Sequence, residues 1–471
     1  MSRRAESARV VLGIGFFFGW LLSFPLYGPF LAGLEALRGG VAASAGKAFT
    51  VSHAGALFTL GLWFSRGGIS SRAIHVLSRA GLAGSVAATL ALCYGPPRLW
   101  MYPQVVAGVS AAAYVLWWGP RFRSTIPVSH RGRMMAIGMI VANVFYALAV
   151  LALPIAGVHG IALANLALLA LALWASEGLT QQPAGVTGRS TAADKGIGAR
   201  DGVIPWFGVM VLAFCVVGGL YYEVALPYFN QVPFDKSLQA LPYIAALGLA
   251  GRYADSRGRK PLAVVAVLAM GVSYALAPMV PPLARYFGSL FLINVAFAAF
   301  DLFLWVSLAD LSDSRDPYWM YGWGLGLNVT GILLGSLLSA WLLPHTGTDI
   351  IVACALTAVT ALFLATYGLI RVLGAESLRA SYPLHQPRLS TPGVSLPPDV
   401  AARLTPRERE IAQLMLHAVP NSAIEVRLNL APGTLKTHIA HIYQKLGVNS
   451  RQRLTLLALN GEAGRDPACR A

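Results

Sequence analysis

The sequence has few charged residues for its length. Asp, Glu, Lys and Arg together make up 12% of its 471 residues, and hydrophobic residues make up 56%, whereas a soluble globular domain usually carries about 25% charged residues. This composition excludes a disordered or collagen-like chain, and it leaves too little polar surface to cover a soluble globular core. We therefore expect most of the chain to lie within a lipid bilayer.

Cysteine is also scarce. The four cysteines, Cys93, Cys215, Cys354 and Cys469, show no CxxC or metal-ligand spacing, so a disulfide-rich secreted scaffold is excluded and no metal site is predicted. Acidic residues are fewer than basic ones, 20 against 36, and the net charge is +16. Because membrane proteins also collect Lys and Arg in cytoplasmic loops, this excess does not by itself indicate a nucleic-acid partner.

Long apolar runs recur along the first 372 residues, each close to the roughly 20 residues that a transmembrane helix needs. They form two sets of six, in residues 1–176 and 203–372, separated by the polar segment 177–202, which we expect to be a flexible connector. The pattern predicts an all-α polytopic membrane protein with twelve transmembrane helices, and eleven is the alternative because one run is short. The runs are 10–34, 46–64, 73–95, 99–118, 133–156 and 158–176, then 203–228, 236–250, 261–282, 286–308, 319–343 and 348–372.

Positive charge is distributed unevenly between alternate loops. Lys and Arg gather in the loops on the side of the N-terminus, as in the group from Arg121 to Arg133, and they are few on the other side. This bias predicts a multi-pass protein of the inner (cytoplasmic) membrane with both termini in the cytoplasm. One inner loop, 309–317, departs from the pattern because it carries Asp310 and two further aspartates against a single Arg.

A short polar motif follows the eighth apolar run. It reads GRYADSRGRKP over residues 251–261 and resembles the G-x-L-A-D-x-x-G-R-K/R loop of the major facilitator superfamily, which occurs between the second and third helices and again between the eighth and ninth. The resemblance implies a fold of two six-helix halves, in which this loop latches one arrangement of the halves. The residues that carry it are Gly251, Asp255, Gly258, Arg259 and Lys260.

The residue types of this motif indicate how it would act. Its glycines predict a tight turn between helices, Asp255 can accept hydrogen bonds from a neighbouring helix N-terminus, and the basic residues can hold the inner surface. A degenerate copy lies 190 residues earlier, where Gly61, Ser65 and Gly68 align with the first glycine, the acid and the second glycine. Because Ser65 replaces the acid, we expect an asymmetric latch. A loop that is merely positively charged is the alternative.

Four ionisable residues, Glu223, Asp301, Arg79 and His53, interrupt the apolar runs, and such residues are costly within a bilayer. Arg79 lies within snorkelling reach of the inner surface and is expected to be structural, which leaves the other three as functional candidates. Glu223 and His53 fall in the outer halves of the seventh and second spans, where they could face a cavity open to the outside, and Asp301 lies nearer the inner end of the tenth span. We predict that these residues bind an unknown small-molecule ligand or a proton. For the two acids, a paired and purely structural role is the alternative.

After the last apolar run the chain becomes soluble in character. Residues 373–402 contain five prolines and show no helical apolar stripe, so they are predicted to form a linker. Residues 403–471 begin with an amphipathic helix, for which Thr405 as N-cap and Glu408 three residues later predict a capping box. Helices over 422–428 and 432–446 follow, and Gly447 ends the second of these. The last two helices predict a helix-turn-helix.

This C-terminal stretch resembles the LuxR-type DNA-binding domain. The family's L-T-x-R-E-x-E opening, T-V/L-K-x-H core and K-L-x-V-x-S-R close occur in order between Leu404 and Arg451. In that family the core helix lies in the major groove, so the resemblance implies double-stranded DNA as a partner and a homodimer on DNA. By resemblance, Lys436, Thr437 and Ala440 face base edges, while Thr434, His438 and Lys445 approach phosphates. His441 projects from the same helix.

Three alanines depart from the LuxR pattern. Ala431 stands where a capping Ser is usual, Ala423 where a Glu is usual, and Ala418 where a Gly is usual. Loss of a helix cap costs about 1 kcal/mol, so we expect a less stable recognition helix, partly offset by Pro432 at its start.

These features predict a membrane-integral transcriptional regulator with the membrane module as sensor and the tail as DNA-binding domain. No enzymatic activity and no cofactor is predicted. The expected partners are double-stranded DNA, the lipid bilayer and an unknown small molecule. One alternative is a major-facilitator-type transporter with a fused regulatory tail, and another is an interaction protein whose tail docks onto a protein partner.

Overall fold

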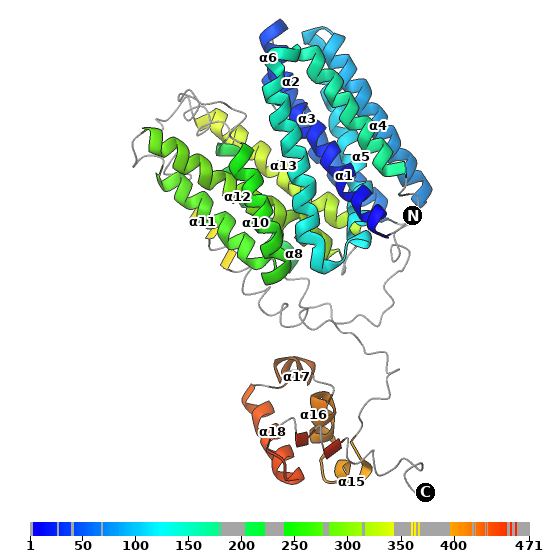
Figure 1. Cartoon of the computed structure of the whole chain (residues 1–471), viewed down its shortest axis with the longest axis vertical. Coiled ribbons are helices and arrows are strands. Elements are labelled where there is room, and N and C mark those ends of the chain that lie inside the picture. The colour runs from blue at the N-terminus through cyan, green and yellow to red at the C-terminus, as the bar shows by residue number, and fades with distance from the viewer. Residues whose placement is uncertain are drawn as a thin grey trace. The chain divides into compact units, whose positions relative to one another are not determined.

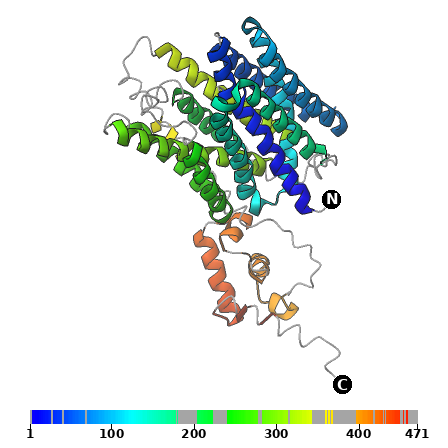
Figure 2. The same cartoon turned by 45° about the horizontal axis from the view of Figure 1, so that its top comes forward.

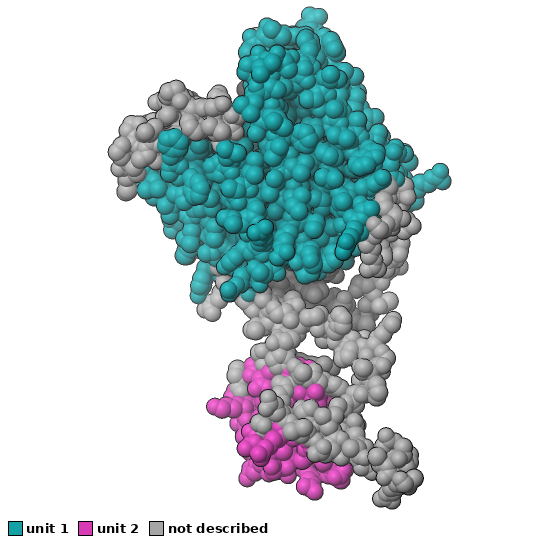
Figure 3. Space-filling model, viewed as in Figure 1, with its two compact units in different colours: residues 1–370 teal, residues 371–471 magenta. Residues whose placement is uncertain are grey.

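In the computed structural model, all secondary structure among the described residues is helical (Figure 1). It divides into two compact units, residues 1–370 and 371–471, which Figure 3 colours separately. The described residues are 3–25, 28–38, 42–66, 69–177, 179, 203–221, 240–276, 282–312, 316–342, 359–360, 362–363, 366–367, 396–416, 419, 421–428, 430, 432–449, 453–454 and 457–458.

The helices of the first unit follow the predicted apolar runs. Before the predicted connector they are α1 (Arg3–Ser23), α2 (Pro29–Arg38), α3 (Ala42–Ser65), α4 (Ser71–Tyr94), α5 (Met101–Thr125) and α6 (Arg131–Glu177). After it they are α8 (Val203–Leu220), α10 (Ala240–Arg257), α11 (Lys260–Leu276), α12 (Pro282–Leu311) and α13 (Pro317–Leu342). The twelfth run, 348–372, lies mostly outside the described residues, so the count of twelve stays a prediction. Within the described residues, five stretches are long and apolar enough to cross a membrane: Arg4–Ser23, Ser71–Tyr94, Val128–Glu177, Phe287–Leu311 and Pro317–Trp341.

The first predicted span is divided between α1 and α2. Helix α1 ends at Ser23, and α2 begins at Pro29, where a proline has no intrahelical bond to lose. The rings of Trp20 and Phe24 stack with their centroids 5.5 Å apart, and those of Phe24 and Phe30 stack at 5.1 Å. All three rings are fully buried, so aromatic packing holds the chain in the core across the break.

Helix α6 is a hairpin of two helical arms, as the two separate apolar runs in this region predict. Its 47 residues would extend about 70 Å if straight, yet both ends lie beside the end of α5. Arg131 Nη2 donates to the Arg123 carbonyl oxygen at 2.9 Å, and Arg121 Nε donates to the Leu179 carbonyl oxygen at 3.2 Å. The chain reverses at Gly157, with φ 64° and ψ −178°. The dark-blue α1 lies against the teal arms of α6 (Figure 2).

The two halves of the membrane unit meet along two pairs of helices, α3 with α13 and α6 with α10. Each pair contains a contact between glycines. A Cβ on Gly61 would lie 2.8 Å from the Gly322 Cα, and a Cβ on Gly251 would lie 3.1 Å from the Gly132 carbonyl oxygen. Gly61 and Gly251 are 190 residues apart, and so are Gly132 and Gly322. The two contacts are therefore equivalent in an internal repeat, as two parallel halves produce.

The second unit has its own hydrophobic core. Its helices are α15 (Pro398–Ala401), α16 (Pro406–Leu416), α17 (Asn421–Leu428) and α18 (Pro432–Leu446). The predicted capping box is confirmed, because Glu408 N donates to Thr405 Oγ1 at 3.3 Å and Thr405 N donates to Glu408 Oε2 at 2.9 Å. The buried core residues are Leu396, Val400, Leu404, Ile411, Ala412, Leu414, Met415, Ile424, Leu428, Leu435, Ile442, Leu446 and Leu454. The predicted linker 373–402 therefore extends too far, because Leu396, Val400 and α15 belong to the packed domain.

The predicted end of α18 is also confirmed. Gly447 has φ 64°, its N–H donates to the Gln444 carbonyl oxygen at 3.4 Å, and the Val448 N–H donates to the Tyr443 carbonyl oxygen at 3.0 Å. These two bonds form a Schellman motif, which satisfies carbonyl groups that the helix end would otherwise leave without partners.

We expect Gly157→Ala to destabilise the full-length protein by about 1–3 kcal/mol, because an alanine side chain disfavours this backbone conformation. Gly55, within α3, is a matched control: a Cβ would meet nothing within 4 Å at either glycine, and only Gly157 of the two has a positive φ. Thermal unfolding in detergent should show a lower midpoint for Gly157→Ala and no decrease for Gly55→Ala. Equal midpoints for the two variants would contradict the backbone explanation.

Candidate functional site

The face of α18 opposite its buried stripe carries the residues predicted to contact DNA. Leu435, Ile442 and Leu446 are buried, because the helical period places them on one side of α18. On the other side the side chains of Thr434, Lys436, Thr437, Ala440, His441 and Lys445 are exposed, and His438 is half-buried. The structure thus brings the predicted residues together on one helix, and their roles toward DNA stay predictions.

Lys445 makes an ion pair within its own domain. Its ammonium donates to both carboxylate oxygens of Glu408, with Nζ 2.8 Å from Oε1 and 2.6 Å from Oε2. The Glu408 side chain is 4% exposed, whereas that of Lys445 is 40% exposed. Lys445 therefore ties α18 to the first turn of α16, a link between distant residues that the sequence pattern did not indicate.

Glu408 is kept ionised by its partners. Burial alone would raise the pKa of its carboxyl group, but hydrogen bonds from Lys445 and Thr405 outweigh burial and lower that pKa to about 2. A carboxyl group whose pKa is lower in the folded state adds stability above its unfolded pKa, near 4.5. That stability is lost as the pH falls from about 4.5 toward 2.

We expect Lys445→Ala to lower the free energy of unfolding of a fragment starting at residue 396 by about 1–3 kcal/mol at pH 7, because it leaves Glu408 buried without its cation. Lys436→Ala, which removes an exposed lysine from the same helix, should change it by less than about 0.5 kcal/mol. Urea unfolding at pH 7 and pH 3 tests both variants. The wild type should weaken between these values, and equal stability of the two variants would contradict the structural role of Lys445.

In the membrane unit, Asp255 caps a helix of the other half. Its Oδ1 accepts from Gly132 N at 2.8 Å and its Oδ2 accepts from Arg133 N at 3.0 Å, at the start of α6. The first N–H groups of a helix lack intrahelical acceptors and carry partial positive charge, so they favour a carboxylate. The sequence expectation that Asp255 accepts from a helix N-terminus is confirmed. We call this end of the membrane unit the motif end.

The expected loop conformation is correct only in part. Gly258 has φ 88° and ends α10, as the predicted turn requires. Gly251 was expected to form a turn, and this is wrong, because it lies within α10, where a Cβ would come 2.7 Å from the Ala136 Cβ. The helix continues to Arg257, which carries Asp255 to the N-terminus of α6, so Gly251 serves close helix packing.

Asp310 also joins the halves at the motif end, although it lies outside the motif. Arg131 Nη1, on α6, donates to Asp310 Oδ1 at 2.7 Å, and Arg259 Nε donates to Asp310 Oδ2 at 3.0 Å. Arg259 also donates to the Val128 carbonyl oxygen at 2.8 Å. The signal in the sequence was the acidic loop 309–317, which departs from the positive charge of the other inner loops.

The equivalent contact in the other pair of helices lacks the acid. Ser65 Oγ donates to the Leu62 carbonyl oxygen of its own helix at 2.8 Å. Helix α13 begins at Pro317, before Tyr321, the residue that matches the start of α6 after 190 residues. Its first N–H groups are capped by Asp316, whose Oδ1 accepts from Tyr318 N at 2.9 Å. No free helix N-terminus therefore faces Ser65 among the described residues.

We expect Asp255→Asn to lower the thermal midpoint of the detergent-solubilised protein, because it removes the negative charge that faces two backbone N–H groups. The expected loss in the free energy of unfolding is about 1–3 kcal/mol. Ser65→Ala, at the equivalent position of the first half, should leave the midpoint unchanged. The comparison uses unfolding of the full chain monitored by tryptophan fluorescence. A loss of the same size in Ser65→Ala would refute the asymmetry.

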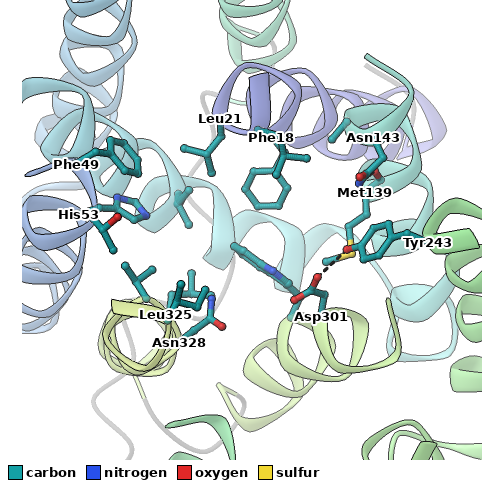
Figure 4. Close-up of a pocket in the computed structure, with 17 residues that line it drawn as sticks. Phe18, Leu21, Phe49, His53, Met139, Asn143, Tyr243, Asp301, Leu325 and Asn328 are labelled. Atoms are coloured by element: carbon teal, nitrogen blue, oxygen red, sulfur yellow. Dashed lines mark hydrogen bonds between the residues drawn. The ribbon is translucent and has the colours of Figure 1, made fainter. Parts of the chain in front are cut away.

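Two of the three intramembrane candidates line one cavity of about 180 Å³ between the halves (Figure 4). Asp301 and Tyr243 lie on one side of it, and His53 and Phe49 on the other. Asp301 Oδ2 accepts from the Tyr243 hydroxyl at 2.7 Å. Glu223, the third candidate, lies outside the described residues. Both halves line the cavity. The first half contributes α1, α3, α5 and α6, and the second half contributes α10, α12 and α13.

His53 is held firmly at its side of the cavity. It is buried, its ring stacks on that of Phe49 at a centroid distance of 5.3 Å, and its Nδ1 lies 2.8 Å from the Gly108 carbonyl oxygen. A carbonyl oxygen can only accept, so Nδ1 carries the proton in this bond. In the neutral ring Nε2 remains an acceptor.

The three departures from the LuxR pattern lie in or next to α17 and α18. Ala418 and Ala431 lie outside the described residues, and the side chain of Ala423 is not described. Helix α18 nevertheless begins at Pro432, as the sequence predicts.

The folds of the two units define a membrane protein with a soluble helix-turn-helix domain, and comparison with solved structures identifies the membrane fold. The chain superposes on the proton:xylose symporter XylE of the major facilitator superfamily with a TM-score of 0.58 and 15% identity, covering 78% of this chain and 95% of that one. It superposes on a bacterial homologue of the iron transporter ferroportin, in an outward-facing state, with a TM-score of 0.59 and 14% identity, covering 79% and 99%. The membrane unit has the major facilitator fold.

The C-terminal domain matches a described family. Residues 402–458 match the model of "Bacterial regulatory proteins, luxR family". The chain is 45% identical over 58 residues to a candidate HTH-type transcriptional regulator of Aeromonas salmonicida, covering 12% of this chain and 30% of that protein. It is 41% identical over 49 residues to the nitrate/nitrite response regulator protein NarL of Escherichia coli strain K12, covering 10% and 23%. The chain thus spans less than a third of these relatives, and it joins a LuxR-type helix-turn-helix domain to a major facilitator fold.

Proposed function

We propose that this protein is a membrane-integral transcriptional regulator. Its LuxR-type domain binds double-stranded DNA, and its membrane unit senses a small molecule. The observation that carries the proposal is the face of α18 around Lys436, Thr437 and Ala440, exposed in a domain of a regulatory family. An α-helix of this kind fits the major groove, where side chains reach base edges.

The membrane unit supports a sensory role through its cavity. A ligand changes the balance between two arrangements of the halves only if it binds one of them better. Because both halves line the cavity, its shape depends on how they are arranged. The proposal places the protein in the inner membrane with both termini in the cytoplasm, where the tail can reach DNA, and it includes pairing of two tails on adjacent half-sites.

A transporter with a fused regulatory tail is the second candidate. It is supported by the same cavity and by the likeness of the membrane unit to transporter folds. Transport assayed with residues 373–471 deleted separates the two candidates, because a transporter keeps solute uptake or efflux without its tail. A tail that docks only onto a protein would leave no DNA associated with the purified membrane protein. No step of the proposal involves catalysis.

The decisive experiment is sequencing of DNA recovered with the full-length protein after crosslinking in cells. We expect this experiment to recover a set of specific sites. Lys436→Ala should weaken binding to these sites by about 1–3 kcal/mol, because Lys436 is assigned to a base edge. Arg403→Ala is a matched control, since it removes one exposed positive charge before α16; it should preserve the sites and alter only the salt dependence of binding. Unchanged recovery of the sites by Lys436→Ala would disprove the assigned face.

A further inference from the structure

The central cavity contains an acid that has no cationic partner among the described residues. Among its described lining residues Asp301 is the sole acid, and none is Lys or Arg. The Tyr243 hydroxyl donates one hydrogen bond to Oδ2, and no ion pair to Asp301 exists within the described residues. An ionised carboxylate within the membrane is costly unless a charge neutralises it. A tyrosine hydroxyl supplies a hydrogen bond but no charge, so the site is electrostatically incomplete.

Two other polar groups of the cavity, Asn143 and His53, are also able to accept hydrogen bonds. Asn328 offers its amide N–H groups instead, because its Oδ1 accepts from Cys215 Sγ at 2.8 Å. Asn143 Nδ2 donates to the Met139 carbonyl oxygen at 2.9 Å, which leaves the amide oxygen of Asn143 as an acceptor. The His53 Nδ1 is engaged with Gly108, which leaves Nε2 as an acceptor in the neutral ring. A carboxylate and two neutral acceptors match a ligand that carries several N–H groups.

Aromatic rings form the wall next to the acid. Trp305 lies four residues after Asp301 on α12, so the two side chains share one face of the helix. The Phe18 ring packs edge-on against Trp305 at a centroid distance of 5.1 Å, and both rings line the cavity. Faces of tryptophan and phenylalanine rings attract cations electrostatically. An aromatic wall beside the acid is therefore compatible with a ligand of positive charge.

The size of the cavity limits the ligand. Its volume is about 180 Å³, and an apolar protein cavity of about 150 Å³ holds a benzene molecule. The space therefore fits a body the size of one six-membered ring together with one small polar group.

We propose that the cavity binds a small organic cation, with a primary ammonium group paired to Asp301 and a ring-sized apolar body against Trp305 and Phe18. This inference deepens the proposed function and rests on it, since it names the ligand class of the same cavity. Asp301 and Trp305 lie on α12, whereas Phe18 and Asn143 lie on α1 and α6. Such a ligand touches both halves and binds best to the arrangement that brings them together.

The test measures binding to the purified full-length protein in detergent. The probes are benzylammonium and cyclohexylammonium, with benzyl alcohol, cyclohexanol and benzoate as neutral and anionic counterparts of matched size. By isothermal titration calorimetry, we expect each cation to bind at least about 10-fold more tightly than its neutral counterpart, as a charge-assisted hydrogen bond provides. If neither cation exceeds its neutral counterpart, or if benzoate binds best, the inference is overturned.

Variants test whether Asp301 is responsible for the preference for cations. Asp301→Asn should weaken cation binding about 10–100-fold without weakening benzyl alcohol, and its thermal midpoint without ligand should not fall, because an uncompensated charge is removed. Tyr243→Phe keeps the carboxylate and should keep the preference for cations, so it serves if Asp301→Asn does not fold. Glu35→Gln is the matched control, since it neutralises an exposed acid on α2. Undiminished cation binding by Asp301→Asn would overturn the assignment.

The outcome is distinguishable from a failure of the proposed function. Calorimetry needs no DNA, whereas regulation is measured in cells as expression from the sites recovered by crosslinking. Binding of cations through Asp301, with expression indifferent to Asp301→Asn, would reject the sensor and keep the ligand class. Regulated expression with no preference for cations would reject the ligand class and keep the regulator.

Discussion

The carboxylate of Asp255 lies against the N-terminus of a helix from the opposite half, and the arrangement of the membrane unit depends on this contact. The side chain is 3% exposed, so water cannot replace either of its two N–H donors. Arg131, Arg259 and Asp310 add an ion-pair network around the same point. Because these groups join the halves at the motif end, the cavity between them acquires a defined shape.

Two equivalent pairs of helices join the halves of the membrane unit, α3 with α13 and α6 with α10, and they are stabilised by different interactions. Both keep a close approach of glycines, since Gly61 and Gly251 are each packed against backbone of the facing helix. Among the described residues, the α6–α10 pair adds the Asp255 cap and, at the same end, the ion pairs of Asp310 with Arg131 and Arg259. In the α3–α13 pair the additional helical turn at the start of α13 has its own cap, Asp316. A carboxylate at Ser65 would therefore find no free helix N-terminus among the described residues. The serine at position 65 is thus consistent with the earlier start of α13.

The features that could be predicted from the sequence are those determined by residues close together in the chain. The capping box of Thr405 and Glu408, the bounds of α18 and the glycine at its end all follow from residues within one or two turns of each other. The motif of the major facilitator superfamily also identified Asp255, because its spacing is local although its partner is not. The sequence could not indicate the pairing of Asp310 with Arg131, which lie 179 residues apart, or that of Lys445 with Glu408. Such partners are determined by packing of distant helices, which periodicity does not encode.

The reversal at Gly157 also bears on how the protein enters the bilayer. A single non-helical residue separates the two arms of α6, and the segment around it, PIAGVHG, contains no Asp, Glu, Lys or Arg. Moving polar loops and unpaired backbone groups through hydrocarbon is what makes insertion of a helix pair costly. Here almost no such material has to cross, so we expect the two arms to insert together as one helical hairpin.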